Sequence, residues 1–334
     1  MTAEAAIRRD PAELAGEHDF ACFVRTLARG PGRARALTRE EARRAFGMVL
    51  AGEADPHQIG AFLMLLRFRG EEATELAGMV EAARETIGAV PPRGMAVDLD
   101  WPSYGAGRTR NAPWFLLAAL ALARAGHRIV MHGSNEFSSG TSVADALGQL
   151  GLRPATGRAD AERLLDREGF AYLPLAALSS PLEGLLQLRA VLGLRSPVNT
   201  LVRLLDPFDA HASIDGVFHP PYIALHLNAA RLLDRRRLLV LKGGGGEAER
   251  NPAKAVTAHL YDAGTGPGEI EFPPLAPGME FAGDLQRVWL GEDEAPVPIV
   301  IATIALGLIA LGRAGTPADA DRIAADLWRR CRSG

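Results

Sequence analysis

The stretch PWFLLAALALARAGHRIVMHG, residues 113–133, decides the fold class. Its first part is an apolar run that predicts a buried helix at about residues 113–125, and its second part predicts a strand at residues 127–131. Residues 95–99, followed by a glycine-containing turn, predict another strand ahead of the helix. Strand, loop, helix and strand in this order make a βαβ unit. We therefore expect a parallel sheet with its ligand site at the carboxyl ends of the strands.

The sequence on either side extends this pattern. Residues 238–241 predict a later strand of the same kind, which ends in Lys242 and four glycines. The first ninety residues instead have the spacing of helices, with a capping-box pattern at Thr38 and Glu41 and a helix start at Asp55 and Pro56. A third helix is expected at about residues 71–87.

The run Val-Pro-Pro-Arg-Gly at residues 90–94 breaks the helical pattern and predicts a domain boundary. We predict a helical domain at residues 1–92 and an α/β domain at residues 93–334. The expected fold class is α/β, with a small N-terminal helical domain and a larger domain built on a mostly parallel central sheet. We expect the helical domain to mediate dimerisation together with helices from about residues 180–210.

The composition narrows the functional class only a little. The net charge is −3, so the chain lacks the overall basic excess common in nucleic-acid binders, yet of its 37 basic residues all but Lys242 and Lys254 are arginine. A GC-rich coding bias explains that number, although not the positions. The longest late apolar stretch, residues 297–311, is too short for a membrane span of ~20 residues, and the N-terminus has no secretory pattern. We expect a cytoplasmic protein.

Several motifs in order along the chain resemble those of the anthranilate phosphoribosyltransferases. Residues 130–134, then Ser138 and Ser139, then residues 144–145 resemble that family's Lys-His-Gly-Asn, Ser-Ser and Ser-Ala-Asp signature at the same spacing. Further matches lie at residues 37–42, 58–63, 75–78, 192–195, 199 and 206–207. The resemblance covers residues 20–325 approximately, and it implies this family's fold.

The resemblance implies transfer of a phosphoribosyl group from phosphoribosyl pyrophosphate to an aromatic amine. Family members cradle the phosphates with a Gly-Thr-Gly-Gly-Asp loop and an Asn-Ile-Ser-Thr helix start, where amides and hydroxyls donate hydrogen bonds. Here the loop reads DWPSYGAGR at residues 100–108, and the helix start reads PWFL at residues 113–116. Met131 replaces the family lysine. These losses together predict a degenerate donor site, since each charge-assisted contact contributes on the order of 1.5–3 kcal/mol.

By family position, His132 is expected near the acceptor amine and Arg189 at the aromatic acid, so these two are the candidate catalytic residues. Arg203 stands where the family has a proline lining the acceptor pocket. Family enzymes hold a second magnesium ion with an adjacent Asp-Glu pair. Here the corresponding residues are Glu247 and Glu249, which leave Mg²⁺ as a weak expectation.

The departures themselves resemble the divergent YbiB-like branch of the family. That resemblance implies a homodimer without the biosynthetic activity that binds nucleic acid with little sequence preference. Arginines beside aromatic residues suit such binding because they grip phosphates and stack on bases. The candidate phosphate- or nucleic-acid-binding residues are Tyr104, Arg108, Arg110, Ser138, Ser139, Arg203 and Lys242. Two alternatives stay open, a transferase with an altered donor or acceptor and a scaffold dimer that binds neither ligand.

Overall fold

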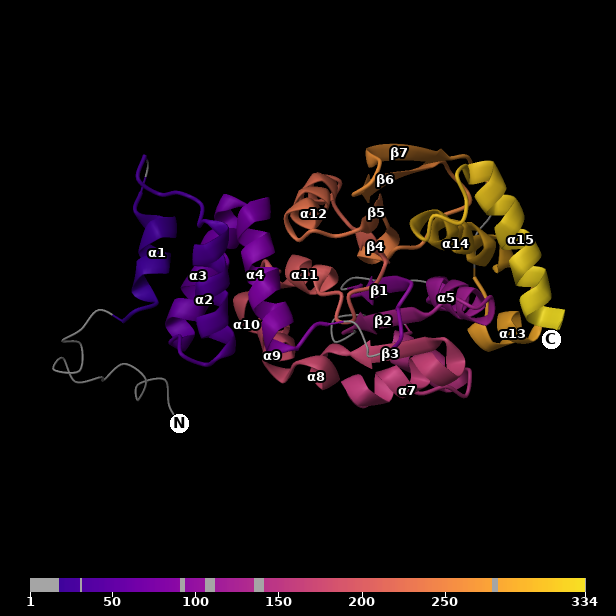
Figure 1. The fold of residues 1–334 in the computed structure, drawn as a ribbon, viewed down its shortest axis with the longest axis horizontal. Helices are drawn as coiled ribbons and strands as arrows, with labels where there is room; N and C mark the ends of the chain where they lie inside the picture. The colour runs from indigo at the N-terminus through magenta and orange to yellow at the C-terminus, as the bar shows by residue number, and fades with distance from the viewer. Residues whose placement is uncertain are drawn as a thin grey trace.

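The computed structural model describes residues 18–30, 32–90, 94–105, 112–134, 141–277 and 282–333. Four helices lead the chain: α1 Ala21–Ala28, α2 Arg39–Leu50, α3 Pro56–Arg69 and α4 Ala73–Thr86. Both predicted helix starts are confirmed, because Thr38 and Glu41 form a complete capping box on α2, and Asp55 caps α3 with Pro56 in the first turn. These helices form the small domain at one end of the molecule (Figure 1).

The larger domain is built on a seven-stranded sheet in the order β3-β2-β1-β4-β5-β6-β7. Its strands are β1 Leu99–Ser103, β2 Ile129–Gly133, β3 Phe170–Pro174, β4 Ala212–Val217, β5 Arg237–Lys242, β6 Val256–Asp262 and β7 Gly266–Phe272. The first five pair in parallel, and β6 and β7 add an antiparallel edge. The predicted fold class, a small helical domain and a mostly parallel α/β domain, is therefore confirmed.

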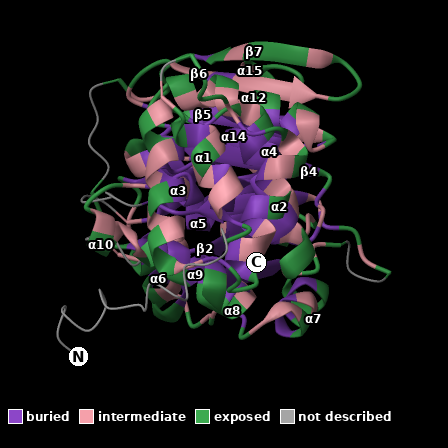
Figure 2. Cartoon of the chain, turned by 90° about the vertical axis from the view of Figure 1, so that its left-hand side faces the viewer, coloured by how far each residue is buried: buried purple, intermediate pink, exposed green. Residues whose placement is uncertain are grey.

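Alternate side chains of each strand point to opposite faces of the sheet, and each face has its own apolar core. Leu239 and Leu241 pack with α5 Trp114–Arg124, α14 Val297–Ala310 and α15 Pro317–Ser333. Leu238 and Val240 pack on the other face with α12 Pro221–Leu232 and the helical domain. A parallel sheet covered on both faces needs such apolar strands. The buried residues run continuously through the molecule behind α1 and α3 (Figure 2).

A third apolar group lies beneath α7 Arg158–Glu168, beside β3. The remaining elements are α6 Val143–Gln149, α8 Leu175–Leu178, α9 Ser180–Gln187, α10 Arg189–Leu192, α11 Val198–Leu201, the short 3-10 helices η3 Val202–Leu204 and η4 Gly244–Gly246, and α13 Leu285–Leu290. Within the described ranges, no helix is long and apolar enough to cross a membrane. The predicted domain boundary at residues 92 and 93 lies outside the described residues.

The first strand begins later than the sequence predicts. Residues 95–99 were the expected strand, whereas β1 runs from Leu99 to Ser103 and includes Trp101 and Pro102. Pro102 weakens the strand signal because proline cannot donate a ladder hydrogen bond. The sheet tolerates it because the register of β1 with β4 stops at Asp100, so the strand pairs only with β2 beyond that residue.

Candidate functional site

The carboxyl ends of β1 and β2 meet in a buried chain of three polar side chains. The Tyr104 hydroxyl is hydrogen-bonded to His132 Nδ1 at 2.8 Å, and His132 Nε2 lies 3.3 Å from Asp100 Oδ1. His132 and Asp100 are completely buried. Burial raises the pKa of the Tyr104 phenol well above its ordinary value, and nearby Tyr172 and Asp100 raise it further. Tyr104 is therefore a neutral hydroxyl that covers His132.

This arrangement bears on two predicted roles, which stay predictions. His132 was expected beside a substrate amine, yet it lies behind Tyr104. Tyr104 was expected to offer its ring to a base, yet only 4% of its surface is exposed. Both differences have one cause, because β1 continues to Ser103 and draws Tyr104 against the end of the sheet instead of leaving it in an open loop.

The glycine-rich turn after β5 packs into the same end of the sheet. A Cβ on Gly105 would lie 2.4 Å from Glu247 Oε1, and a Cβ on Gly216 or Gly243 would overlap the Glu247 backbone. Glycine is required at Gly216 and Gly243 because two backbone segments approach so closely there, whereas Gly105 meets the Glu247 side chain. Glu247 is buried, and it fills space beside the end of β1 where the resemblance predicts a phosphate-binding loop.

The start of α5 has an acidic partner from the same turn. The Phe115 backbone N–H donates to Glu249 Oε2 at 3.0 Å. The first amides of a helix lack partners within the helix and carry partial positive charge, so they attract anions such as phosphate. In this chain, the Glu249 carboxylate is the anion at that position.

Each of the expected magnesium ligands has a contact within the protein. Glu247 packs against Gly105, and Glu249 accepts from Phe115. Throughout the part of the chain that the structure describes, no three His, Cys, Asp or Glu residues gather as metal ligands. Binding of Mg²⁺ by Glu247 and Glu249 therefore stays a prediction.

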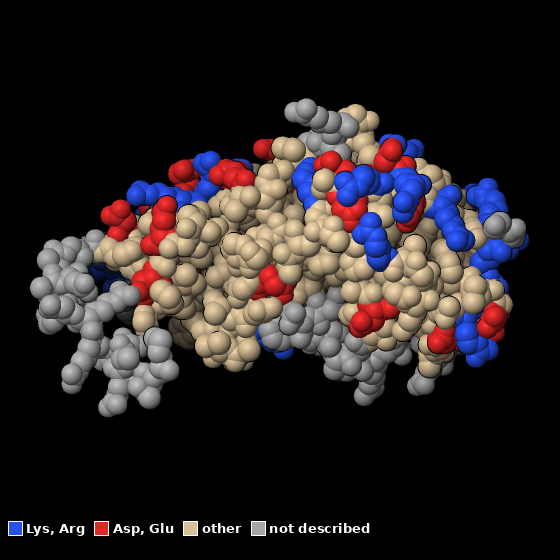
Figure 3. Space-filling model, turned by 90° about the horizontal axis from the view of Figure 1, so that it is seen from below, with Lys and Arg blue, Asp and Glu red and all other residues tan. Residues whose placement is uncertain are grey.

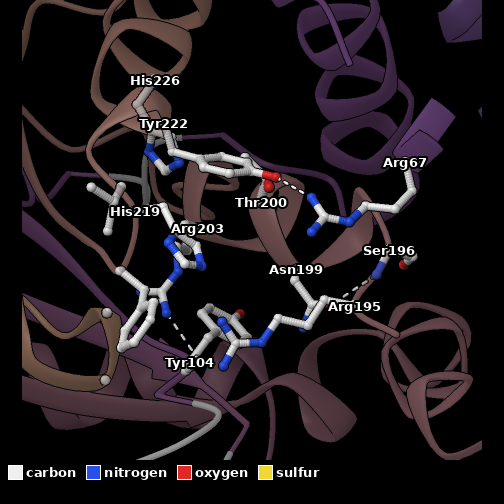
Figure 4. A pocket seen from close by; sticks show the side chains of 14 residues that line it. Arg67, Tyr104, Arg195, Ser196, Asn199, Thr200, Arg203, His219, Tyr222 and His226 are labelled. Carbon is white, nitrogen blue, oxygen red and sulfur yellow. Dashed lines mark hydrogen bonds between the residues drawn. The ribbon is translucent and has the colours of Figure 1, made fainter. Parts of the chain in front are cut away.

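A separate pocket of about 90 Å³ lies between the helical domain and the sheet. Arg67 reaches it from the end of α3, Arg195 from the turn between α10 and α11, and Arg203 from η3 (Figure 4). A further wall of the pocket is formed by the segment from Val217 at the end of β4 to Tyr222 in the first turn of α12. The positive end of the α12 dipole thus lies at this wall.

The pocket gathers three positively charged side chains. Arg67 donates to the Tyr222 hydroxyl at 2.5 Å, and Arg203 Nη2 donates to the Tyr104 carbonyl at 3.0 Å, so both bind neutral partners. Burial lowers the pKa of Arg195, and repulsion from Arg189, Arg203 and Arg67 lowers it further.

Two carboxylates close to this pocket already have partners. Asp215 Oδ2 lies 2.7 Å from His226 Nδ1, and Glu71 accepts from Thr200 at 3.2 Å. Arg203 is 8% exposed, and its Nη1 has no hydrogen-bond partner among the described residues. The pocket is therefore a candidate anion site.

Comparisons with known proteins agree with this fold. The helical bundle domain of the glycosyl transferase family matches residues 23–87, and the a/b domain of the same family matches residues 114–316. Anthranilate phosphoribosyltransferase from Rhizobium rhizogenes is 31% identical over 301 residues, which cover 86% of this chain and 88% of that protein. The chain belongs to the anthranilate phosphoribosyltransferase-like glycosyl transferase family.

One further relative and two solved structures are also similar to this chain. Protein YbiB of Escherichia coli is 28% identical over 313 residues, covering 90% of this chain and 97% of that protein. Among solved structures, anthranilate phosphoribosyltransferase from Thermus thermophilus has a TM-score of 0.74 at 23% identity, covering 95% of this chain and 96% of that one. The Saccharomyces cerevisiae enzyme, solved with PRPP and Mg, has a TM-score of 0.73 at 17% identity and covers 95% of each chain.

The structure of this glycosyl transferase family member places only some of the predicted site residues together. Arg203 lies in the pocket, Lys242 is exposed at the end of β5 in register with Val217 of the pocket wall, and half-buried Arg189 lies close enough to repel Arg195. The predicted positions Arg108, Arg110, Ser138 and Ser139 lie outside the described residues.

Sequence reasoning missed Arg67, Phe218 and Tyr222 and did not assign Arg195 to the site. Arg195 stood inside a family-like motif, and Arg67 interrupts an apolar helix, so each had a weak signal. Neither signal indicates a shared pocket, because the residues come from segments far apart in the sequence.

Within the arginine-rich run at residues 231–237, two arginines are engaged inside the protein, and Arg231 and Arg236 are exposed. Arg235 is buried against Asp206, and Arg237 binds Asp262 and the Ala310 carbonyl. On the face in Figure 3, basic and acidic side chains alternate instead of forming a continuous basic stripe. The convergence of three arginines on one pocket therefore distinguishes it from this mixed surface.

Proposed function

We propose that this chain is a non-biosynthetic member of its family that binds nucleic acid as a homodimer, with little preference for sequence. The observation that carries the proposal is the convergence of Arg67, Arg195 and Arg203 on one pocket. At its mouth, Phe218 is 48% exposed and packs edge-on against the exposed His219 at a ring distance of 4.7 Å. Guanidinium groups bind phosphates, and exposed rings stack on bases. The pocket and its mouth therefore offer both kinds of contact that a nucleic-acid strand requires.

The loss of biosynthetic activity is supported by what fills the expected donor site. Glu249 accepts from the start of α5, and Glu247 lies beside the end of β1. A pyrophosphate at these positions would approach two carboxylates and meet the apolar side chains of Trp114 and Phe115. Like-charge repulsion in a buried site opposes binding of that anion.

The homodimer is supported by apolar side chains that a monomer leaves exposed on the helical side. Phe68 on α3 is 93% exposed, Val191 on α10 is 81% exposed, and Leu194 is 56% exposed. Large apolar side chains grouped on a surface are typical of protein interfaces. A second copy of this chain is the partner we propose, in agreement with the expected use of helices near residues 180–210.

Salt-dependent binding tests the nucleic-acid proposal. We expect a labelled oligonucleotide to bind in fluorescence anisotropy and to lose affinity steeply as salt rises, because each phosphate contact releases counterions. The double variant Arg67→Gln with Arg195→Gln is expected to weaken binding and to reduce the slope of log K against log salt by about one for each contact removed. Arg322→Gln on α15, at the opposite end of the molecule, is the matched control. Absence of binding to single and double strands at low salt would refute the proposal.

A second candidate is a transferase with an altered donor or acceptor. The buried pair of His132 and Tyr104 favours it, because an imidazole hydrogen-bonded to a hydroxyl can move a proton. This candidate predicts that PRPP with Mg²⁺ raises the melting temperature, since a ligand that binds only the folded state stabilises it. An unchanged melting temperature at millimolar PRPP with Mg²⁺ would contradict this candidate.

A further inference from the structure

The arginine pocket has the size of one chemical group. Its volume of about 90 Å³ is well below the roughly 300 Å³ at which pockets begin to take a whole drug-sized ligand. A nucleoside therefore has to remain at the mouth, beside Phe218 and His219, while a single anionic group enters. The three guanidinium groups inside define what that group is.

The unpartnered donor of the pocket points to a missing acceptor. Arg203 Nη2 is held by the Tyr104 carbonyl, whereas Nη1 of the same buried guanidinium has no hydrogen bond among the described residues. A buried charged donor without a partner is destabilising. Nη1 has almost no accessible surface, so a small oxyanion satisfies it once the guanidinium turns towards the pocket. Gly246 keeps this space open, because a Cβ there would lie 3.2 Å from Arg203 Nη2.

The charge of the pocket favours a dianion over a monoanion. Arg67, Arg195 and Arg203 face it. These three guanidinium groups outnumber the nearby carboxylates Asp215 and Glu71. A phosphomonoester carries a charge of about −1.5 to −2 at neutral pH and presents three free oxygens. An internal phosphodiester carries a single charge and has only two free oxygens. The strand also continues from both of its ester oxygens, so two chain segments would have to leave the pocket.

We infer that the pocket binds a phosphomonoester, so that a nucleic-acid strand enters it by a phosphorylated end. The strand-end form of this inference rests on the proposed nucleic-acid function. The terminal phosphate lies among the three arginines, the single ester link leaves through the mouth, and the terminal base stacks on Phe218. A free mononucleotide would present the same group, and the experiment separates the two sources.

Two titrations of the full-length protein test the inference. The first compares one labelled oligonucleotide with a 5′-phosphate, a 3′-phosphate or hydroxyl ends. The second compares adenosine monophosphate, a monoester, with cyclic adenosine monophosphate, a diester, by calorimetry. We expect a phosphorylated end to improve affinity at least about tenfold, as one additional charge-assisted contact would, and the monoester to bind better than the cyclic diester.

Arg203→Gln is expected to bring the ratio between phosphorylated and hydroxyl ends to about one, and Arg322→Gln to leave it unchanged. Arg195→Gln, at a half-buried position, gives the same test if Arg203→Gln fails to fold. Equal affinity for all ends with wild-type protein overturns strand-end recognition and leaves nucleic-acid binding intact. Monoester binding without oligonucleotide binding supports the pocket and refutes the nucleic-acid function, and no binding in either titration overturns both.

Discussion

At the scale of single residues, Tyr104 makes the contacts that close the end of the sheet in this chain. Its hydroxyl is hydrogen-bonded to His132, its carbonyl accepts from Arg203, and its ring separates the buried histidine from the arginine pocket. One side chain thus joins the end of the sheet to the candidate anion site. A buried polar group in this position is destabilising unless its hydrogen bonds are made.

Tyr104→Phe is expected to destabilise the fold by about 1–3 kcal/mol, because it leaves the Nδ1 atom of a completely buried His132 without a partner. Chemical denaturation measures the change. Tyr261→Phe on β6 is the control, since no hydrogen bond of that hydroxyl is found among the described residues, and its effect should stay within about 0.5 kcal/mol. Equal effects of the two substitutions would show that the Tyr104 contact contributes nothing to stability.

At the scale of the helix pair, α2 and α4 pack closely through Gly78. A Cβ added there would lie 2.1 Å from the Arg39 carbonyl oxygen and 2.9 Å from the Arg43 nitrogen. We expect Gly78→Ala to push the helices apart and to destabilise the protein by about 1–3 kcal/mol. Gly47→Ala on α2 meets nothing within 4 Å and is expected to stabilise by up to about 1 kcal/mol. Denaturant midpoints of the two variants that shift in the same direction would contradict this packing.

The start of α2 predicts a pH dependence. The Arg35 guanidinium lowers the pKa of Glu41 to about 2, and the Thr38 backbone contributes to the shift. Since the pKa is lower in the folded state than its ordinary 4.5, ionised Glu41 stabilises the protein above pH 4.5. That stabilisation is lost as pH falls towards 2.

Glu41→Gln keeps a capping side chain and removes the charge. Its melting temperature should fall below that of the wild type at neutral pH, and the two should converge as the pH falls to about 2. Glu53→Gln, at an exposed position, serves as the control. A difference for Glu41→Gln that stays constant with pH would exclude the ion pair as its cause.

At the scale of the whole molecule, the exposed apolar residues lie at opposite ends and are not equivalent. Phe68 belongs to the helical side, where Val191 and Leu194 are also exposed, whereas Leu290 on α13 is 62% exposed at the far end of the α/β domain (Figure 1). Among the described residues, Phe68, Val191 and Leu194 therefore make the helical side the face that we propose for a second copy.

We expect Phe68→Asp to convert the dimer into a monomer, because a carboxylate buried in an apolar interface lacks a partner. Leu290→Asp should leave the assembly unchanged. Light scattering coupled to gel filtration distinguishes these results. A wild-type chain that is monomeric at micromolar concentration would refute the homodimer.

Local patterns were sufficient for most of the fold. The capping residues Thr38 and Asp55 and the apolar runs of α5 and β2 were readable because each depends on neighbours within a few residues. The sequence placed the start of β1 too early because Pro102 weakens the strand signal. The sheet tolerates Pro102 because the pairing of β1 with β4 ends at Asp100.

The sequence by itself determined the helical domain, the parallel sheet and the absence of the family's phosphate-binding residues, since these follow from spacing and residue type. Only the tertiary structure decided that Glu249 lies at the start of α5, that Tyr104 covers His132, and that Arg67 meets Arg195 and Arg203. The physical reason is that these contacts depend on how the helical domain packs against the ends of the strands. No local periodicity encodes the distance between side chains on separate elements.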